Sequence, residues 1–266
     1  MMRANFHTHT VYCDGSDTPA ELAQAALDQG LTALGFSGHI DPDCGMSPEG
    51  EANYRREIRA LQAQLAGRLE IFCGVEQDYC CGAVDPWYDY AIGSVHYIPK
   101  DGELLSVDWS AQRTAEHIRD HYAGDTYAYA EDYYALAGRV LEVTGGVIVG
   151  HFDLLTKFDE AGTTFRQTES RYRAAVLDAL DRLCETRPVF EINTGAMGRG
   201  YRATPYPAFW ILEELRRRDC PIMITSDCHD RAKLTLGYDL AVRLAREAGY
   251  PHQVRLTPDG FADLAF

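Results

Sequence analysis

Two histidines near the start of this 266-residue sequence, His7 and His9, have a spacing that suits metal binding. Side chains at positions i and i+2 of an extended backbone point to the same side, so both imidazoles would face one site. Neutral imidazole is a good ligand for Zn, Fe, Mn, Ni or Cu. The pair alone is as typical of a chance surface or core arrangement as of a metal site, so its interpretation depends on further ligands.

Further histidines and carboxylates stand shortly after later apolar segments of the chain. These candidate ligands are His39, Glu76, His96, His151, Asp227 and His229. A polar residue after an apolar run is common in turns, but six of the nine histidines belong to this set or to the first pair. The carboxyl ends of parallel strands meet on one face of an α/β fold, where catalytic groups gather. The sequence therefore predicts a site that binds more than one metal ion.

Strand and helix patterns alternate between these candidate ligands. The segment Thr18-Pro19-Ala20-Glu21 predicts a helix start, with Thr18 as the N-cap and Glu21 closing a capping box. Further helices are predicted over residues 53–65, 111–143 (two helices, broken near Gly124), 168–185, 207–218 and 232–248. Buried strands are predicted over residues 31–36, 69–75, 90–95, 147–149, 189–192 and 222–225, with a loop over 193–206. No linker or repeat interrupts this alternation, so we expect one α/β domain over residues 1–266 with about seven strands.

The net charge and the length of the apolar runs indicate which classes of binding partner to expect. The formal net charge of −15 disfavours a general nucleic-acid binder, which needs a basic face against the phosphates. It does not disfavour a small phosphorylated substrate, because bound metal cations invert the local field. No apolar run reaches the roughly 18 residues of a membrane span, and the N-terminus shows no signal-peptide pattern. We therefore expect a cytoplasmic protein without a membrane partner.

A series of short motifs resembles that of the polymerase and histidinol phosphatase (PHP) family. The motifs are His7-Thr8-His9-Thr10, Cys13-Asp14-Gly15, Ser37-Gly38-His39, Gly74-Val75-Glu76, Gly93-Ser94-Val95-His96, Gly150-His151-Phe152-Asp153 and Ser226-Asp227-Cys228-His229. Two further segments resemble the histidinol-phosphate phosphatase branch of that family, Glu191-Ile192-Asn193-Thr194 and Pro205-Tyr206-Pro207. The series extends from residue 7 to residue 229 and so covers nearly the whole chain.

The resemblance implies a distorted (β/α)7 barrel of the PHP type, with three divalent metal ions in its mouth. The implied ligand sets are His7, His9, Glu76 and Asp227 for the first ion, Glu76, His96 and His151 for the second, and Asp14, His39 and His229 for the third. Three or four protein ligands per ion leave room for water and phosphate oxygens, as a catalytic site requires. Mixed nitrogen and oxygen ligands do not discriminate between Zn, Fe and Mn.

The resemblance also implies an activity, the hydrolysis of a phosphate monoester. Its branch points to L-histidinol phosphate, which is converted to L-histidinol and phosphate in histidine biosynthesis. In the implied mechanism the metal ions neutralise charge on the phosphoryl group, and a hydroxide held between two of them attacks phosphorus in line. No protein nucleophile is needed. We expect Glu76, Asp227 and His229 to take part in catalysis.

Three other residues are candidates for substrate binding. Arg199 and Lys157 are cations in segments that follow predicted strands, and both suit a phosphate group. Tyr97, after the His96 strand, could stack on an imidazole substrate. The branch usually has Asn-Thr-Ser-Gly-Leu-Arg-Lys, whereas here Gly198 stands where that arginine is expected. Either Arg199 or Arg202 takes its place, or the substrate preference differs.

Two alternatives remain open from the sequence. The same machinery could act on another phosphoester, such as a nucleotide or a short oligonucleotide. A non-enzymatic metal-binding module could also keep the barrel, although the complete set of ligands argues against a site that has decayed. The sequence leaves the metal identity and the oligomeric state open.

Overall fold

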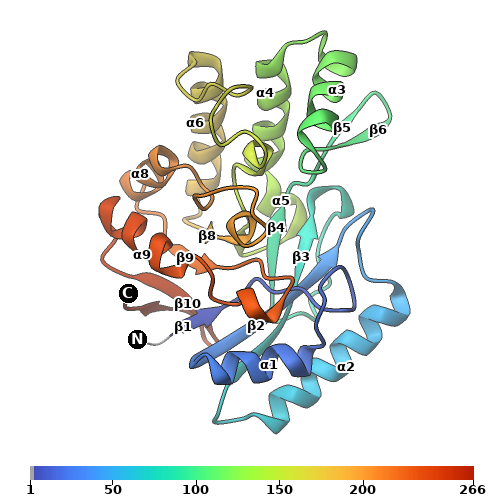
Figure 1. Cartoon of the computed structure of the whole chain (residues 1–266), viewed down its shortest axis with the longest axis vertical. Coiled ribbons are helices and arrows are strands. Elements are labelled where there is room, and N and C mark those ends of the chain that lie inside the picture. Colours follow the sequence, from blue (N-terminus) through green and yellow to red (C-terminus); the bar gives the residue numbers. More distant parts are fainter. Residues whose placement is uncertain (1–2) are drawn as a thin grey trace.

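A parallel sheet of seven strands forms the centre of the computed structural model, which describes residues 3–266 (Figure 1). In sheet order the strands are β1 (Arg3–Asn5), β2 (Leu31–Ile40), β3 (Glu70–Asp78), β4 (Tyr90–Ser94), β7 (Ile148–Val149), β8 (Val189–Asn193) and β9 (Ile222–Thr225). Every neighbouring pair in this sheet is parallel. The helices between the strands supply the crossover connections that parallel pairing needs.

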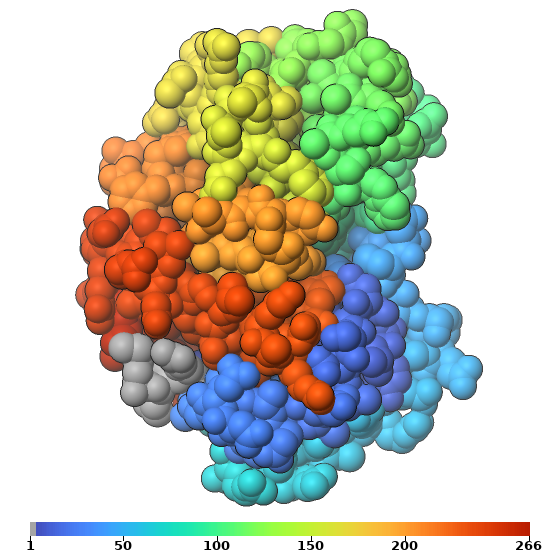
Figure 2. Space-filling model, in the orientation of Figure 1, coloured from blue at the N-terminus to red at the C-terminus, as the bar shows by residue number. Residues whose placement is uncertain are grey.

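The two outer strands of the sheet approach one another just beyond their carboxyl ends. Thr8 and Cys228 form a parallel bridge there, and the backbone N–H of His9 donates to the carbonyl of Cys228 at 2.8 Å. The space-filling view shows the blue segment that follows β1 against the orange-red segment that follows β9 (Figure 2). The sheet is therefore a nearly closed barrel, which confirms the expected fold.

Helices pack around the barrel (Figure 1). They are α1 (Pro19–Asp28), α2 (Pro48–Gln64), α3 (Ala111–Tyr122), α4 (Thr126–Ala137), α5 (Val140–Thr144), α6 (Ser170–Cys184), α7 (Gly195–Gly198), α8 (Phe209–Arg217) and α9 (Tyr238–Glu247), with 3-10 turns at Tyr79–Cys81, Leu154–Thr156 and Arg231–Lys233. The predicted capping box is present, because Thr18 accepts from the N–H of Glu21 and the Glu21 carboxylate accepts from that of Thr18. Within the described residues, no helix is both long and apolar enough to cross a membrane.

Several predicted boundaries were wrong. The strand predicted to end at Phe36 continues to Ile40, and the one predicted to end at Val75 continues to Asp78. Both extend because their ladder continues, with His39 paired to Glu76 in register. The last helix begins at Tyr238 rather than near residue 232. Gly237 has a left-handed φ of 82°, which separates this helix from the preceding 3-10 turn at Arg231–Lys233.

Two antiparallel hairpins were not predicted. The first pairs β5 (Tyr97–Lys100) with β6 (Glu103–Ser106) through Asp101 and Gly102, which both have positive φ as a two-residue hairpin turn requires. The second pairs β10 (Gln253–Thr257) with β11 (Gly260–Leu264). Its side chains Val254, Leu256 and Leu264 pack with residues inside the barrel, among them Phe6 and Tyr90.

Close packing inside the barrel centres on Tyr90. Its hydroxyl donates to the carbonyl of Phe6 at 2.6 Å and lies 3.0 Å from that of Phe36, so the ring joins strands that are far apart in sequence. A Cβ added at Gly74 would stand 2.3 Å from the Tyr90 ring. The glycines of β2 and β3 therefore make room for a side chain that cannot swing away without losing its hydrogen bonds.

We expect Gly74→Ala to lower the free energy of unfolding by about 1–3 kcal/mol, because an added methyl group overpacks a fixed ring. The measurement is urea unfolding of the metal-free protein. Gly198→Ala is the matched control, since its Cβ would make only ordinary contacts with Lys233 at 3.6 Å or more, and its effect should stay within about 0.5 kcal/mol. Equal effects of the two substitutions would contradict this account of the barrel core.

Candidate metal centre

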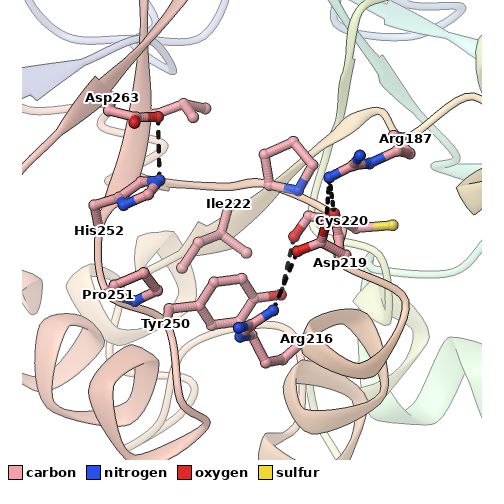
Figure 3. Close-up of a pocket in the computed structure, with 11 residues that line it drawn as sticks. Arg187, Arg216, Asp219, Cys220, Ile222, Tyr250, Pro251, His252 and Asp263 are labelled. Carbon is pink, nitrogen blue, oxygen red and sulfur yellow. Dashed lines mark hydrogen bonds and ion pairs between the residues drawn. The ribbon is translucent and has the colours of Figure 1, made fainter.

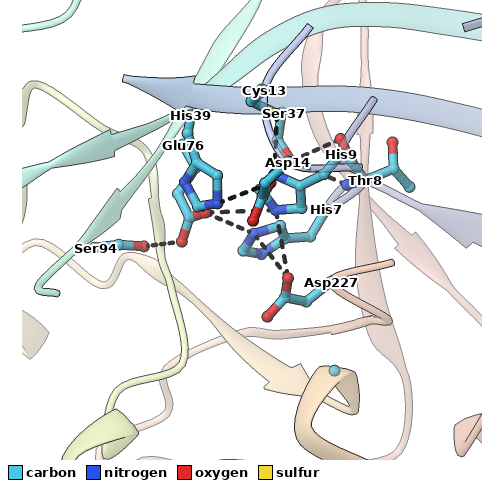
Figure 4. Close-up of polar contacts among 12 residues, drawn as sticks. His7, Thr8, His9, Cys13, Asp14, Ser37, His39, Glu76, Ser94 and Asp227 are labelled. Carbon is cyan, nitrogen blue, oxygen red and sulfur yellow. Dashed lines mark hydrogen bonds and ion pairs between the residues drawn. The ribbon is translucent and has the colours of Figure 1, made fainter. Parts of the chain in front are cut away.

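All nine predicted metal ligands meet at the carboxyl ends of the barrel strands. His39 and Glu76 lie on β2 and β3 themselves, and the others lie in the segments that follow β1, β4, β7 and β9. Figure 4 shows the imidazoles of His7, His9 and His39 turned toward the carboxylates of Glu76 and Asp227. Residues that are more than 200 positions apart in the chain thus share one site, as with His9 and Asp227 at 3.3 Å.

The carboxylate of Glu76 is the centre of this cluster. Its side chain is 1% exposed. The oxygen Oε2 lies 3.2 Å from Nε2 of His7, 3.5 Å from Nε2 of His9 and 3.1 Å from Nδ1 of His39. One carboxylate oxygen therefore faces three imidazoles, which come from the first two strands of the barrel.

The second oxygen of Glu76 faces another pair of imidazoles. Oε1 lies 2.8 Å from Nε2 of His151 and 3.4 Å from Nε2 of His96, and it accepts a hydrogen bond from the Ser94 hydroxyl at 2.6 Å. Because the two oxygens serve different histidines, this carboxylate has the geometry to bridge two bound ions.

Two further carboxylates complete the cluster. Oδ1 of Asp227 lies 3.3 Å from Nε2 of His9 and 3.5 Å from Nδ1 of His229. Asp14 is more exposed, and its oxygens lie 3.0 Å from Nε2 of His229 and 3.5 Å from Nε2 of His39. The three ligand sets implied by the sequence are therefore each brought together, with Glu76 shared between two of them.

The protonation states favour a bound cation. Burial opposes ionisation of Glu76, but the nearby imidazoles, His7 first, hold its pKa well below the usual range. Burial likewise opposes ionisation of Asp227, and Arg199 and His7 lower its pKa below the ordinary value. Burial and the neighbouring His229 and His39 lower the pKa of His9 to about 3. Ionised carboxylates and neutral imidazoles are the forms that bind a metal ion. Despite burial, the neighbouring carboxylates raise the pKa of His7 and of His96, so a metal ion that binds these two imidazoles would displace a proton from each.

Unpaired nitrogen atoms provide an independent test of whether these residues fit metal ions. Nε2 of His7, Nε2 of His9 and Nδ1 of His39 are buried and make no hydrogen bond to any described residue. A buried polar atom without a partner is costly, and a cation at this point would supply one for each. The groups His9–Asp14–His39–His229, His7–His9–Glu76 and His39–Glu76–His96 each have ligand atoms within 4.8 Å of one another. The donor set thus fits more than one ion around shared ligands.

Two carboxylates beside the histidines were missed in the sequence analysis. Oε1 of Glu191 lies 2.6 Å from Nδ1 of His7, and Oδ2 of Asp78 lies 3.1 Å from Nδ1 of His96. Each had a signal in the sequence. Glu191 interrupts the apolar run of residues 189–192. Asp78 stands two residues after Glu76, which places Glu76 and Asp78 on the same side of β3.

A cavity of about 340 Å³ opens beside the cluster and is lined by all three predicted substrate-binding residues. Arg199 donates to Oδ2 of Asp227 at 3.0 Å. Lys157 donates to the backbone carbonyl and the carboxylate of Asp108 at 3.0 and 2.9 Å. The Tyr97 hydroxyl lies close to the carboxylates of Asp41 and Asp43, at 3.1 and 3.0 Å.

Arg202, the alternative to Arg199, points elsewhere. Its guanidinium is buried and donates to the carbonyl and the hydroxyl of Thr156 at 3.0 and 2.6 Å. It lines a different surface pocket. Of the two arginines, only Arg199 reaches the cavity that holds the candidate ligands.

Another cavity lies near the start of β9, at the opposite end of that strand from Asp227 (Figure 3). Its charged side chains pair with one another. Arg187 and Arg216 both donate to the Asp219 carboxylate, and His252 lies 3.1 Å from Asp263. This cavity therefore lacks the unpaired buried donors that mark the metal centre.

Comparison with known proteins agrees with this geometry. The sequence model of the PHP domain matches residues 5–195. A probable histidinol-phosphatase of Deinococcus radiodurans is 30% identical over 91% of this chain and 92% of its own length. The histidinol-phosphatase of Bacillus subtilis is 27% identical over 90% and 98%.

Two solved structures share the fold. A putative histidinol phosphatase from Listeria monocytogenes has a TM-score of 0.77 at 18% identity and matches over 90% of this chain and 99% of its own. Histidinol phosphate phosphatase from Lactococcus lactis, in complex with zinc, L-histidinol and phosphate, has a TM-score of 0.74 at 18% identity over 98% of both chains. The match of the family model over most of this sequence shows that the chain belongs to the PHP domain family.

Proposed function

We propose that this protein is a metal-dependent phosphatase that hydrolyses L-histidinol phosphate to L-histidinol and phosphate. The observation that carries the proposal is the convergence of six histidines and two further carboxylates around Glu76, beside a cavity that is lined by Arg199. The names of the two relatives, which match nearly the full length of the chain, support the substrate.

The proposed centre holds three ions in the ligand sets described above. Divalent ions bound there would supply Lewis-acid stabilisation of the phosphoryl group and an activated water. Glu76 would bridge two sets, while Asp227 and His229 would belong to the first and third. We therefore assign these three residues to catalysis. Zinc is the ion in the Lactococcus lactis structure, and the nitrogen and oxygen donors of this chain suit zinc, iron or manganese.

The cavity residues would bind the substrate on two sides. The Arg199 guanidinium lies next to Asp227 and can present further N–H groups to phosphate oxygens. Lys157 directs two hydrogen bonds to Asp108, and its third N–H is free for an anion. These two cations would bind the phosphate together with the metal ions.

Acidic and aromatic side chains in the same cavity suit the amine and the ring of histidinol phosphate. Burial and Asp41 raise the pKa of the Tyr97 hydroxyl, so it stays protonated and can donate to the neighbouring carboxylates. Asp41 and Asp43 line the same cavity as the Tyr97 ring. We infer that Tyr97 offers an aromatic surface to the imidazole, while the two acids favour a cationic amine.

We expect kcat/KM for histidinol phosphate to exceed that for p-nitrophenyl phosphate and for nucleoside monophosphates by at least about tenfold, because only histidinol phosphate carries both a cationic aliphatic amine and a free imidazole ring. Steady-state phosphate release with the metal-loaded protein is the measurement. Equal turnover of histidinol phosphate and p-nitrophenyl phosphate would reject this substrate, and a preference for nucleotides would support the alternative phosphoesterase.

We expect His9→Ala to lower kcat by about 10²–10³-fold and to reduce the metal content, because it removes a ligand from the centre of the cluster. Elemental analysis and phosphate release are measured on the same preparation. His252→Ala is the control, since that histidine lies at the other cavity and pairs with Asp263. Full activity of the His9 variant would contradict the proposed ligand set.

We expect Arg199→Ala to raise KM by about tenfold or more, because a charge-assisted hydrogen bond to phosphate is lost. Arg182→Ala removes an exposed arginine that pairs with Glu142 and should leave KM unchanged. An unchanged KM in the Arg199 variant would mean that this cation serves Asp227 alone.

A further inference from the structure

Glu191 is a buried acid in the middle of β8, with apolar residues on either side of it in the strand. Its side chain is shielded from water and it is not a member of the groups that could hold a metal ion. A buried carboxylate that binds no ion must be stabilised by hydrogen bonds from its neighbours.

Three donors surround this carboxylate. Oε1 lies 2.6 Å from Nδ1 of His7. Oε2 accepts from the backbone N–H of His151 at 3.0 Å and from the side-chain amide of Asn193 at 3.1 Å. An ionised carboxylate only accepts hydrogen bonds, so its presence requires that the proton of His7 be on Nδ1.

This requirement determines what His7 offers to the metal centre. In the neutral ring with its proton on Nδ1, which is the form that binds a metal ion, the lone pair is on Nε2. This buried atom faces Glu76 and Asp227 at 3.2 and 3.8 Å. The other tautomer would place a hydrogen on Nε2 and could not bind a metal ion there. A carboxylate that orients a metal-binding histidine in this way also raises its basicity as a ligand.

Glu191 is also connected to two more candidate ligands, His151 and Asp227. Its bond to the His151 backbone fixes the segment from which that imidazole reaches Glu76. Asn193, held by the N–H of Gly195 at 2.8 Å, directs its amide toward both Glu191 and Asp227. Residues after β1, β7 and β9 are thus connected through one acid on β8.

We propose that Glu191 is a positioning residue of the metal centre, which selects the metal-binding tautomer of His7 and fixes His151. The inference rests on the proposed metal-dependent function and deepens it. Asp78 differs from Glu191, because its Oδ2 contacts the ring and the backbone N–H of His96, and with Asp41 and His96 it forms one of the groups whose ligand atoms lie within 4.8 Å of one another.

Glu191→Gln tests the proposal with almost no change in shape. An amide cannot accept from all three donors, so either its NH2 group faces the donors of His151 and Asn193, or it faces His7 and favours the wrong tautomer. We expect the zinc dissociation constant, measured by competition with a chromophoric chelator, to rise about 10–100-fold. Glu213→Gln, at an exposed position of α8, should leave it unchanged.

The outcomes separate the two hypotheses. If the wild-type protein binds zinc and releases phosphate but Glu191→Gln has the same dissociation constant, the positioning role is wrong and the proposed function stands. If the wild-type protein binds no zinc, the proposed metal-dependent function itself is rejected. A purely structural role would lower the unfolding temperature of the metal-free variant while the folded fraction bound zinc normally.

A second measurement does not depend on the variant being folded. In ¹⁵N-histidine NMR of the zinc-loaded wild-type protein, His7 should carry its proton on Nδ1 and its metal on Nε2. The opposite tautomer would overturn the proposal. Asp78→Asn serves as the comparison variant and should change the signals of His96 while leaving the tautomer of His7 as in the wild type.

Discussion

A carboxylate buried among imidazoles is the constraint on which this structure depends. Both oxygens of Glu76 lie within 3.5 Å of histidine nitrogens, and water hardly reaches the group. Charges in a protein interior need compensation, and adjacent imidazoles cannot all be protonated without repelling one another. The unpaired nitrogens and the ionised acids together leave a position that cations from outside the chain would fill.

The barrel fold brings the residues around Glu76 together. Parallel pairing places His39 beside Glu76 in register, and closure at Thr8 and Cys228 brings the first and last strands together. Close approach of the backbone matters as well. A Cβ at Gly195 would stand 2.6 Å from Oδ2 of Asp227, so the segment after β8 passes the centre only because that position has no side chain.

One acid links the metal centre to the cavity. Oδ1 of Asp227 faces His9, while its Oδ2 accepts from Arg199, which lines the space where a phosphate would bind. The cation that would neutralise the phosphate is thereby held by a residue of the proposed centre itself. Charge on the substrate and charge on the ligands would then be balanced within one connected group, which is the arrangement that phosphoryl transfer favours.

Local patterns in the sequence were sufficient to predict an α/β fold of about seven strands and eight of the nine candidate ligands. The barrel and the ninth ligand, Asp14, were implied by the resemblance to the PHP family. Apolar runs mark the strands, polar residues mark their ends, and the parallel arrangement makes those ends converge. The predicted ends of β2 and β3 were wrong, because these strands are extended by pairing with each other rather than by their own composition. The hairpin at Asp101 and Gly102 had a local turn signal that was missed.

Only the tertiary structure decided how the residues are used. It assigned each oxygen of Glu76 to different histidines, placed Arg199 rather than Arg202 at the cavity, and showed that Lys157 already bonds to Asp108. It also brought Glu191 to His7, although 184 positions separate them in the chain. Hydrogen-bond partners depend on distances of a few tenths of an ångström between distant segments, and no local pattern of residue types specifies those distances.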